Sequence, residues 1–406
     1  MKKIVLGICL LTMTLSLNGC NNKNTIESIN LNKQNNNIDV IQKEIENMTL
    51  DEKIGQIITV GIDGYTINDK TKELIVDKKV GGIILFKDNI NDSNQLLQLI
   101  NNIKDINSKN KIPLFISIDE EGGRVSRLPK EIKKLPSNEV IGNINDKKLT
   151  YDIGKTIGYS LKSFGFNMDF APVLDINSNP NNKVIGDRSF SSNKNIVANL
   201  GVSEINGFKS SNIISVAKHF PGHGDTDIDS HYKLPIINKT LDELKEVEFV
   251  PFKNAIKENV PSIMVSHILL PEIDDINPAS MSKTIITDIL RKDLKFDGLI
   301  VTDDMTMVAI TNDFDISEAC IKSINAGADL LLICHGYETE VDVINNIKDA
   351  VDKGIISIDR INESVYRILS LKYSYKINNE KIENIDVDII NSKIEDILNR
   401  LNKRRV

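Results

Sequence analysis

The sequence contains no tryptophan, few cysteines and no excess of positive charge. Its 406 residues include 50 Lys or Arg and 57 Asp or Glu, so the formal net charge is −7. This balance gives no support to nucleic-acid binding, which requires a basic face. No two of the four cysteines form a CxxC pair, which excludes a cysteine zinc site. With 40% hydrophobic and 26% charged residues, the chain is typical of globular proteins and long enough for one large domain or two small ones.

The N-terminus lacks an apolar run long enough to cross a bilayer comfortably. Two lysines precede the apolar residues 4–17, which have the length of a signal-peptide core. The run ends in "LNGC" at 17–20, followed by polar "NNKN", a pattern that resembles a bacterial lipoprotein signal. We therefore expect residues 1–19 to be a signal peptide, Cys20 to carry lipid, and 20–44 to tether an exported protein to the extracytoplasmic face of the cell membrane. An ordinary secretory signal, with Cys20 incidental, is the alternative.

Removal of the signal leaves two cysteines in the folded part of the chain. Cys320 in "EACIKSI" and Cys334 in "LLLICHG" both have apolar neighbours. Such surroundings favour small buried thiols over a disulfide.

Eight short apolar runs alternate with stretches of helical periodicity. Runs without polar alternation suit parallel strands that are buried on both faces. Strands and helices that alternate eight times predict an α/β fold, a (β/α)8 TIM-type barrel, over residues 45–375. Residues 376–406 are expected to form a polar C-terminal tail. The runs lie at residues 57–61, 81–86, 113–119, 168–176, 213–220, 262–268, 298–304 and 328–335.

Ionisable residues close six of these runs at their C-terminal ends. Barrel enzymes place their active sites on that face. A single Asp there would more often cap a helix, but six such groups favour a polar site. These residues are Asp119, Asp175, His219, His267, Asp303 and His335.

The segment "KHFPGHGDTDIDSH" at residues 218–231 holds three of the five histidines. His219 and His223 have the i, i+4 spacing of helical zinc ligands, but the intervening "FPG" excludes a helix. The "DTDID" stretch begins like a calcium loop. Counted onward, the glycine position of such a loop holds Ser230, and the bidentate glutamate position holds Ile236. Neither a metal site nor a calcium site is therefore expected.

Proton transfer is the remaining chemistry for this segment. Asp229 and His231 are two residues apart, so in an extended loop their side chains lie on the same side. A carboxylate beside an imidazole orients the ring and stabilises its cation, which suits a general acid. A surface ion pair without function is the alternative, and the pair alone does not exclude it.

The same segment resembles the signature of glycoside hydrolase family 3, in its β-N-acetylglucosaminidase branch. The resemblance spans roughly residues 45–375 and depends on further motifs in the same order. The sequence differs in having Glu120 where Gln is common, and it lacks the second α/β domain of many members, so we expect every catalytic residue to come from the barrel. The other motifs are "MTLDEKIGQ" (48–56), "GGIILF" (81–86), "DEEGGRVSRL" (119–128), "NMDFAPVLDI" (167–176), "IGDRSF" (185–190) and "VTDDM" (301–305).

The resemblance implies a role for each matching residue. Family members are retaining glycosidases, and Asp303 matches their carboxylate nucleophile, with His231 and Asp229 as an acid/base dyad. Asp304 follows on the same strand, and strand alternation predicts that only one of the two carboxylates faces the sugar. The positions that match substrate-binding residues are Asp119, Arg127, Arg188, Lys218 and His219.

Four other residues near these motifs receive weaker predictions. Arg124 is expected to form a structural ion pair, and His223 to shape its loop. His267 and His335 are as consistent with structural as with functional roles.

The predicted function is that of an exo-β-N-acetylglucosaminidase, which hydrolyses terminal β-linked N-acetylglucosamine from peptidoglycan-derived or other glycans. We expect a monomer that is bound to the membrane through its lipid, with no nucleic-acid partner, metal or cofactor. Three alternatives remain open: a β-N-acetylglucosaminide phosphorylase, a family 3 β-glucosidase or β-xylosidase, and a surface lipoprotein that only binds glycans.

Overall fold

The computed structural model describes residues 40–226 and 233–404. The chain divides into two compact units, Met1–Glu46 and Asn47–Val406. In the first unit, the described residues 40–46 are helical. Within the described part of the chain, no helix combines the length and the apolar character needed to span a membrane.

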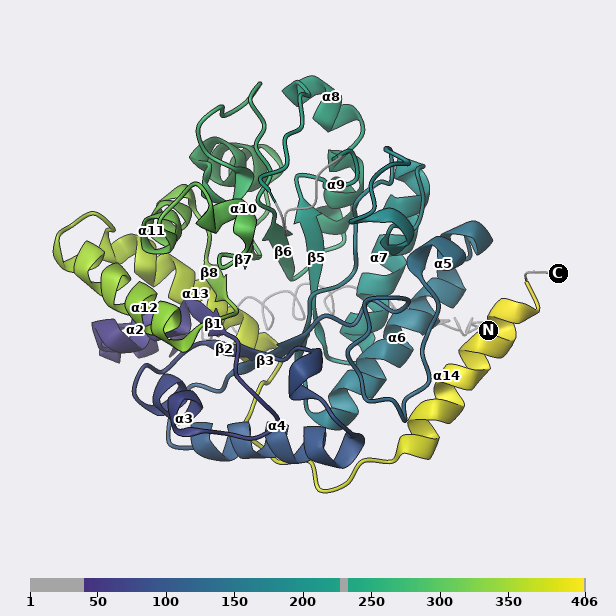
Figure 1. The fold of residues 1–406 in the computed structure, drawn as a ribbon, viewed down its shortest axis with the longest axis horizontal. Coiled ribbons are helices and arrows are strands. Elements are labelled where there is room, and N and C mark those ends of the chain that lie inside the picture. Colours follow the sequence, from purple (N-terminus) through teal and green to yellow (C-terminus); the bar gives the residue numbers. More distant parts are fainter. Residues whose placement is uncertain (1–39, 227–232, 405–406) are drawn as a thin grey trace, which may run out of the picture. The chain divides into compact units, whose positions relative to one another are not determined.

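Eight parallel strands form a closed barrel in the second unit (Figure 1). Each strand pairs with the next along the chain, and β8 closes the barrel against β1, with Thr59 opposite Leu332. The predicted (β/α)8 barrel is therefore confirmed. The strands are β1 (Ile58–Val60), β2 (Gly82–Ile84), β3 (Phe115–Ile118), β4 (Met168–Asp169), β5 (Ile214–Phe220), β6 (Ser262–Val265), β7 (Leu299–Asp304) and β8 (Leu330–Ile333).

Burial on both faces explains the continuous apolar runs of these strands. All residues of seven strands are buried, since the barrel interior takes one face and the surrounding helices take the other. Strand β7 is the exception, because its last two residues, Asp303 and Asp304, are partly exposed. Its C-terminal end therefore opens onto solvent.

Helices surround the barrel (Figure 1). The longer ones are α2 (Leu50–Gln56), α3 (Asp69–Val76), α4 (Ser93–Asn107), α5 (Asn138–Ile144), α6 (Lys147–Phe164), α7 (Lys194–Ser210), α9 (Phe249–Lys257), η4 (Thr284–Asp293, a π-helix), α11 (Ile316–Ala326), α12 (Tyr337–Asp352), α13 (Ile358–Ser374) and α14 (Val387–Asn402). The short ones are η1 (Lys87–Asn89), η2 (Gly186–Arg188), α8 (Leu241–Glu246), η3 (Ala279–Met281) and α10 (Val308–Thr311).

Helix α6 shows how the sequence sets these boundaries. The carboxylate of Asp146 accepts a hydrogen bond from the backbone N–H of Leu149 and so caps the first turn. Gly165 ends the helix in the left-handed region, with φ of 100°, where a side chain would be strained. Between these ends, buried side chains recur with helical spacing and face the barrel, at Leu149, Ile153, Ile157, Leu161 and Phe164.

An ion cluster holds the end of the barrel opposite the strand C-termini. Asp329 directly precedes β8 and is buried, and it pairs with Arg291, with Arg360 at 3.0 Å and with Arg367 at 3.1 Å. Burial by itself would raise the pKa of Asp329, but the three guanidinium groups hold it below its ordinary value. Because this face of a barrel rarely carries chemistry, we assign the cluster to stability.

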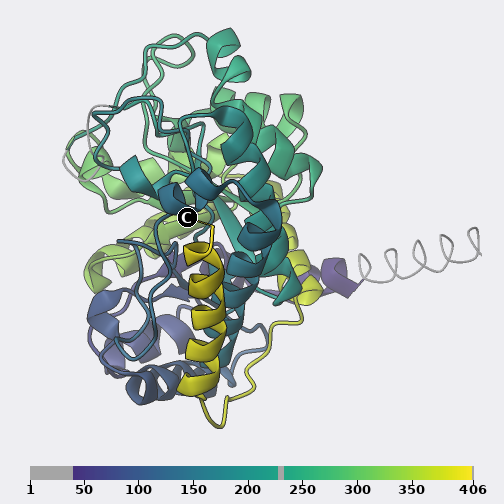
Figure 2. The same ribbon diagram turned by 90° about the vertical axis from the view of Figure 1, so that its right-hand side faces the viewer.

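Residues 376–406, expected as a polar tail, contain helix α14. This helix packs against α6 on the outside of the barrel (Figures 1 and 2). Its buried residues are Ile390, Ile394, Ile397 and Leu401. On its other side, the Asn391 amide accepts from the backbone N–H of Lys133 at 2.7 Å and donates to the carbonyl of Glu131 at 2.8 Å. Helix α14 thus also contacts the loop that follows β3.

Candidate active site

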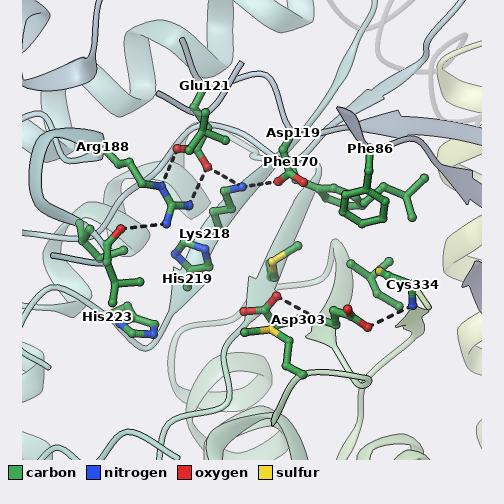
Figure 3. Close-up of a pocket in the computed structure, with 18 of the residues that line it drawn as sticks. Phe86, Asp119, Glu121, Phe170, Arg188, Lys218, His219, His223, Asp303 and Cys334 are labelled. Atoms are coloured by element: carbon green, nitrogen blue, oxygen red, sulfur yellow. Dashed lines mark hydrogen bonds and ion pairs between the residues drawn. The ribbon is translucent and has the colours of Figure 1, made fainter. Parts of the chain in front are cut away.

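A cavity of about 470 Å³ lies at the C-terminal ends of the strands (Figure 3). The prediction from the sequence placed the polar site on this face. Six predicted site residues line this one cavity: Asp119, Arg127, Arg188, Lys218, His219 and Asp303. The predicted acid/base residues, Asp229 and His231, lie outside the described residues, as does Cys20.

One wall of the cavity is a network of buried ion pairs (Figure 3). The Lys218 ammonium lies 2.6 Å from a carboxylate oxygen of Asp119 and 2.7 Å from one of Glu121. The Arg188 guanidinium donates two hydrogen bonds to Glu121, at 2.7 and 2.8 Å. The side chains of Glu121 and Lys218 are only 2% and 3% exposed. The network therefore fixes both cations before any ligand arrives.

Mutual charge keeps Glu121 and Lys218 of this wall ionised. Burial by itself would raise the pKa of Glu121, but Arg188 and Lys218 hold that pKa far below its ordinary value. Burial would likewise lower the pKa of Lys218, but Asp119 and Glu121 raise it above its usual range. The wall presents fixed charges and hydrogen-bond donors to the cavity.

His219 is held by a buried carboxylate behind it. Its Nδ1 lies 2.6 Å from Oδ2 of Asp175, whose Oδ1 accepts the backbone N–H groups of His219 and His223. Burial would raise the pKa of Asp175, but these partners lower it, so the carboxylate is ionised and Nδ1 carries the proton. The remaining nitrogen, Nε2, is left for the cavity.

His223 packs edge-on against His219, with ring centroids 5.8 Å apart. Burial and the nearby His219 lower the pKa of His223 to about 4, so its ring is neutral near pH 7. Asn182 donates to the carbonyl of His223 at 2.8 Å. At Gly224 a Cβ would lie 1.7 Å from the carbonyl oxygen of Ile176. Close packing against the loop after β4 thus fixes the position of His223. Glycine is required at 224 because the backbone of Ile176 leaves no room for a side chain.

Asp303 and Asp304 both line the cavity, against the prediction that only one would face it. The pairing of β7 with β8 shifts between Val301 and Asp304, and this irregularity breaks the alternation of side chains. The two carboxylates nevertheless differ in their partners. Asp304 accepts from the hydroxyl and backbone N–H of Thr306 and from the backbone N–H of Cys334.

Asp303 has a much freer carboxylate. Of the groups in residues 40–226 and 233–404, only the backbone N–H of Asp304 donates to it, at 2.9 Å. Burial would raise the pKa of Asp303, but His267, His219 and that N–H hold it below its ordinary value. His267 is buried beside it and bonds with Ser280 through Nδ1 and with the carbonyl of Asp304 through Nε2. Asp303 is therefore an ionised carboxylate that is available to a ligand.

Two arginines from the loop after β3 lie at the cavity. Arg124 pairs with Asp187 at 2.8 Å, as predicted, and one of its nitrogens also donates to the carbonyls of residues 183–185. Arg127 has no acidic partner among the described residues, and its buried Nε has no hydrogen-bond acceptor there. Its backbone N–H is held by Glu120 at 2.8 Å. Arg127 is thus a positioned cation with free donors.

A family model described as "Glycosyl hydrolase family 3 N terminal domain" matches residues 49–371. This chain belongs to glycosyl hydrolase family 3. It is 36% identical to a β-hexosaminidase A of Pseudoalteromonas piscicida over 76% of this chain and 55% of that protein. It is also 33% identical to a β-hexosaminidase of Neisseria gonorrhoeae, over 72% of this chain and 80% of that one. The chain thus spans about half the length of the first of these relatives.

Solved structures of the family agree with the fold. A family 3 β-N-acetylglucosaminidase from a Paenibacillus species superposes with a TM-score of 0.82 at 36% identity, covering 86% of this chain and 68% of that one. A family 3 hydrolase from Mycobacterium smegmatis gives a TM-score of 0.74 at 29% identity, covering 80% and 98%. The prediction of a glycoside hydrolase is confirmed at the level of the family.

The residue that sequence reasoning missed in this family 3 site is Glu121. The resemblance pointed to Asp119 alone in "DEEGG". Residues two apart on an extended segment face the same side, so Asp119 would have indicated Glu121 as a second acid.

Across the described residues, no group of three His, Cys, Asp or Glu side chains is arranged to hold a metal ion.

Proposed function

We propose that this protein is a retaining exo-β-N-acetylglucosaminidase, which removes terminal β-linked N-acetylglucosamine from glycans such as peptidoglycan fragments. The observation that carries the proposal is the ionised and nearly unpartnered carboxylate of Asp303, which faces a wall of fixed polar groups. The family and the β-hexosaminidase relatives support the choice of sugar.

Asp303 is assigned the role of nucleophile. Its lowered pKa keeps it anionic well below neutral pH, so it can attack the anomeric carbon and form a covalent glycosyl-enzyme. Its single backbone hydrogen bond orients the carboxylate without neutralising it. Asp304 is a poorer candidate, because Thr306 and Cys334 already engage its oxygens.

His231 and Asp229 are assigned the proton transfers. In the first step the His231 imidazolium protonates the leaving oxygen, and in the second the neutral imidazole removes a proton from the attacking water. Asp229 orients the ring and stabilises its charged form. This assignment rests on the sequence motif, since both residues lie outside the described part of the chain.

The polar wall is assigned to binding of the sugar. Asp119 accepts from sugar hydroxyls, whereas Lys218 and Arg188 donate to them. The buried pairs to Glu121 fix both cations, so little side-chain entropy is lost when the sugar binds. Nε2 of His219 and the free donors of Arg127 complete the set.

Hydrolysis of aryl β-glycosides tests the proposal directly. The purified protein should cleave an aryl β-N-acetylglucosaminide much faster than the matching aryl β-glucoside. Equal or faster cleavage of the glucoside would reject the acetamido preference and favour a β-glucosidase. Addition of phosphate tests the phosphorylase alternative, because a phosphorylase would release the sugar 1-phosphate in place of the free sugar.

We also propose export and lipidation at Cys20, on the evidence of the "LNGC" sequence. Cys20→Ala should move the protein from the membrane to the soluble fraction without changing its specific activity. Unchanged membrane association of this variant would argue against the lipid.

A further inference from the structure

We propose that the rings of Phe86 and His335 form a platform that binds the leaving group of the substrate, and that His335 is a specificity-determining residue. The inference deepens the proposed glycosidase function and rests on it. It concerns the group on the far side of the scissile bond, which the polar wall described above does not account for.

The two rings come from strands on either side of β1. Phe86 follows β2 and His335 follows β8, and both line the cavity. Their ring centroids are 5.1 Å apart and their planes are inclined by 31°, so the two rings make contact. In Figure 3, Phe86 lies on the side of the cavity away from Arg188 and His223. The cavity therefore has an aromatic side across from Arg188.

Exposure indicates which part of a substrate this platform meets. The His335 side chain is 66% exposed, whereas the side chains of Lys218 and Glu121 are almost completely buried. A terminal sugar that is bound by the buried wall fills the inner part of the cavity. The group that leaves must then point toward solvent, where an exposed ring lies at the rim.

The chemistry of a sugar ring fits such a surface. Its C–H groups form apolar faces that pack on aromatic rings, while its hydroxyls point outward to water. His335 is not held by the nearest carboxylate, because its Nε2 lies 3.8 Å from Asp304, beyond hydrogen-bond distance. Asp304 is engaged by Thr306 and Cys334, so the imidazole remains free to pack on a ligand.

An electrostatic role for His335 is the competing explanation. A cationic ring near Asp304 could act on the adjacent nucleophile Asp303 and change the rate of the chemical step. The two roles differ in a measurable way. A platform changes the binding of large leaving groups only, whereas a charge effect changes kcat for every substrate.

Three variants and two substrates separate these roles. The variants are His335→Ala, His335→Phe and, as a matched control, Tyr337→Ala, which removes a ring two residues away that is not part of this cavity. The substrates are a β-1,4-linked N-acetylglucosamine disaccharide and the methyl β-glycoside of the same sugar. The methyl group is too small to cover an aromatic ring.

For His335→Ala, we expect the disaccharide KM to rise about three- to ten-fold, with kcat unchanged and the methyl glycoside unaffected. His335→Phe should restore the disaccharide KM, since it keeps a ring without the charge. Tyr337→Ala should match the parent protein on both substrates.

Equal changes for both substrates, or a loss of kcat that His335→Phe does not restore, would overturn the platform in favour of the charge effect. An unchanged disaccharide KM in His335→Ala would overturn it outright. If the parent protein cleaves neither substrate, the proposed function itself is wrong, and this outcome is distinct from the others.

Discussion

Removal of the Glu121 charge tests whether the ion network of the cavity wall is as tightly coupled as its geometry indicates. Glu121→Gln keeps the size of the side chain and one acceptor oxygen but removes its charge. Lys218 then keeps its ion pair with Asp119, whereas Arg188 loses the ion pair that it forms with Glu121. Loss of one partner from a buried ion pair costs about 3–5 kcal/mol. Because the amide retains part of the hydrogen bonding, we expect a loss near the lower end, about 3 kcal/mol in the free energy of unfolding.

The pH dependence of this loss follows from the direction of the pKa shift. The Glu121 pKa is lowered in the folded state from its ordinary value of 4.5. A carboxyl group whose pKa is lower in the folded state than in the unfolded state contributes its full stabilisation at pH values above the unfolded-state pKa. This contribution is lost as the pH falls toward the folded-state pKa. The difference between the parent protein and Glu121→Gln should therefore be largest at neutral pH and smaller by about 1 kcal/mol near pH 3.5.

Urea unfolding at the two pH values measures both quantities. Glu395→Gln is the matched control, because the pair of Glu395 with Lys133 is about half exposed on both sides and should contribute almost nothing. Unchanged stability of Glu121→Gln, or a loss of the same size at both pH values, would refute the coupling that we infer.

Three further variants test other parts of the molecule. Asp303→Ala should abolish turnover in a protein that still unfolds cooperatively in urea. In the parent protein, a fluorinated sugar that traps the intermediate should label Asp303, and a label on Asp304 would refute the assignment. His231→Gln should lower the rate of disaccharide hydrolysis about 10²–10⁴-fold. With an activated aryl glycoside, whose leaving group needs no proton, the rate of the initial burst of released phenol should fall markedly less. Equal losses of rate on both substrates, without a burst, would mean that His231 only binds sugar. Asn391→Ala should lower stability by about 0.5–1 kcal/mol, because it removes two solvent-exposed hydrogen bonds to the backbone of the loop after β3, which water replaces in part; an unchanged urea midpoint would contradict this.

Most of the scaffold was predictable from periodicity alone. Each of the eight strands lies within an apolar run that the sequence indicated, because burial on both faces leaves no polar alternation. Helix α14 was missed as a helix, although its apolar residues Ile390, Ile394, Ile397 and Leu401 have helical spacing. Its many polar residues, of which Arg400 and Lys393 contact Asp152 and Tyr159 of α6, hid this pattern in a segment of low overall hydrophobicity.

The site was harder to derive, because single residues depend on contacts between distant loops. Glu121 gains its importance from Arg188, which is 67 residues away in the chain, and no local pattern shows that pairing. Gly224 is likewise constrained by the backbone of Ile176, which belongs to another loop. Such contacts are properties of the closed barrel and not of any segment of it.

The failure of strand alternation at Asp304 has the same physical origin as the placement of Lys218 and His219. Consecutive side chains on a regular strand face opposite sides, yet both of these pairs of neighbours line the cavity. Pairing shifts register between Val301 and Asp304 on β7 and between Ala217 and Phe220 on β5, at the strand ends that carry these pairs. A shift of this kind turns two successive side chains toward one side. Strand alternation thus holds for the scaffold and fails at the site. Two adjacent polar side chains can share this cavity because the strands that carry them depart from regular pairing there.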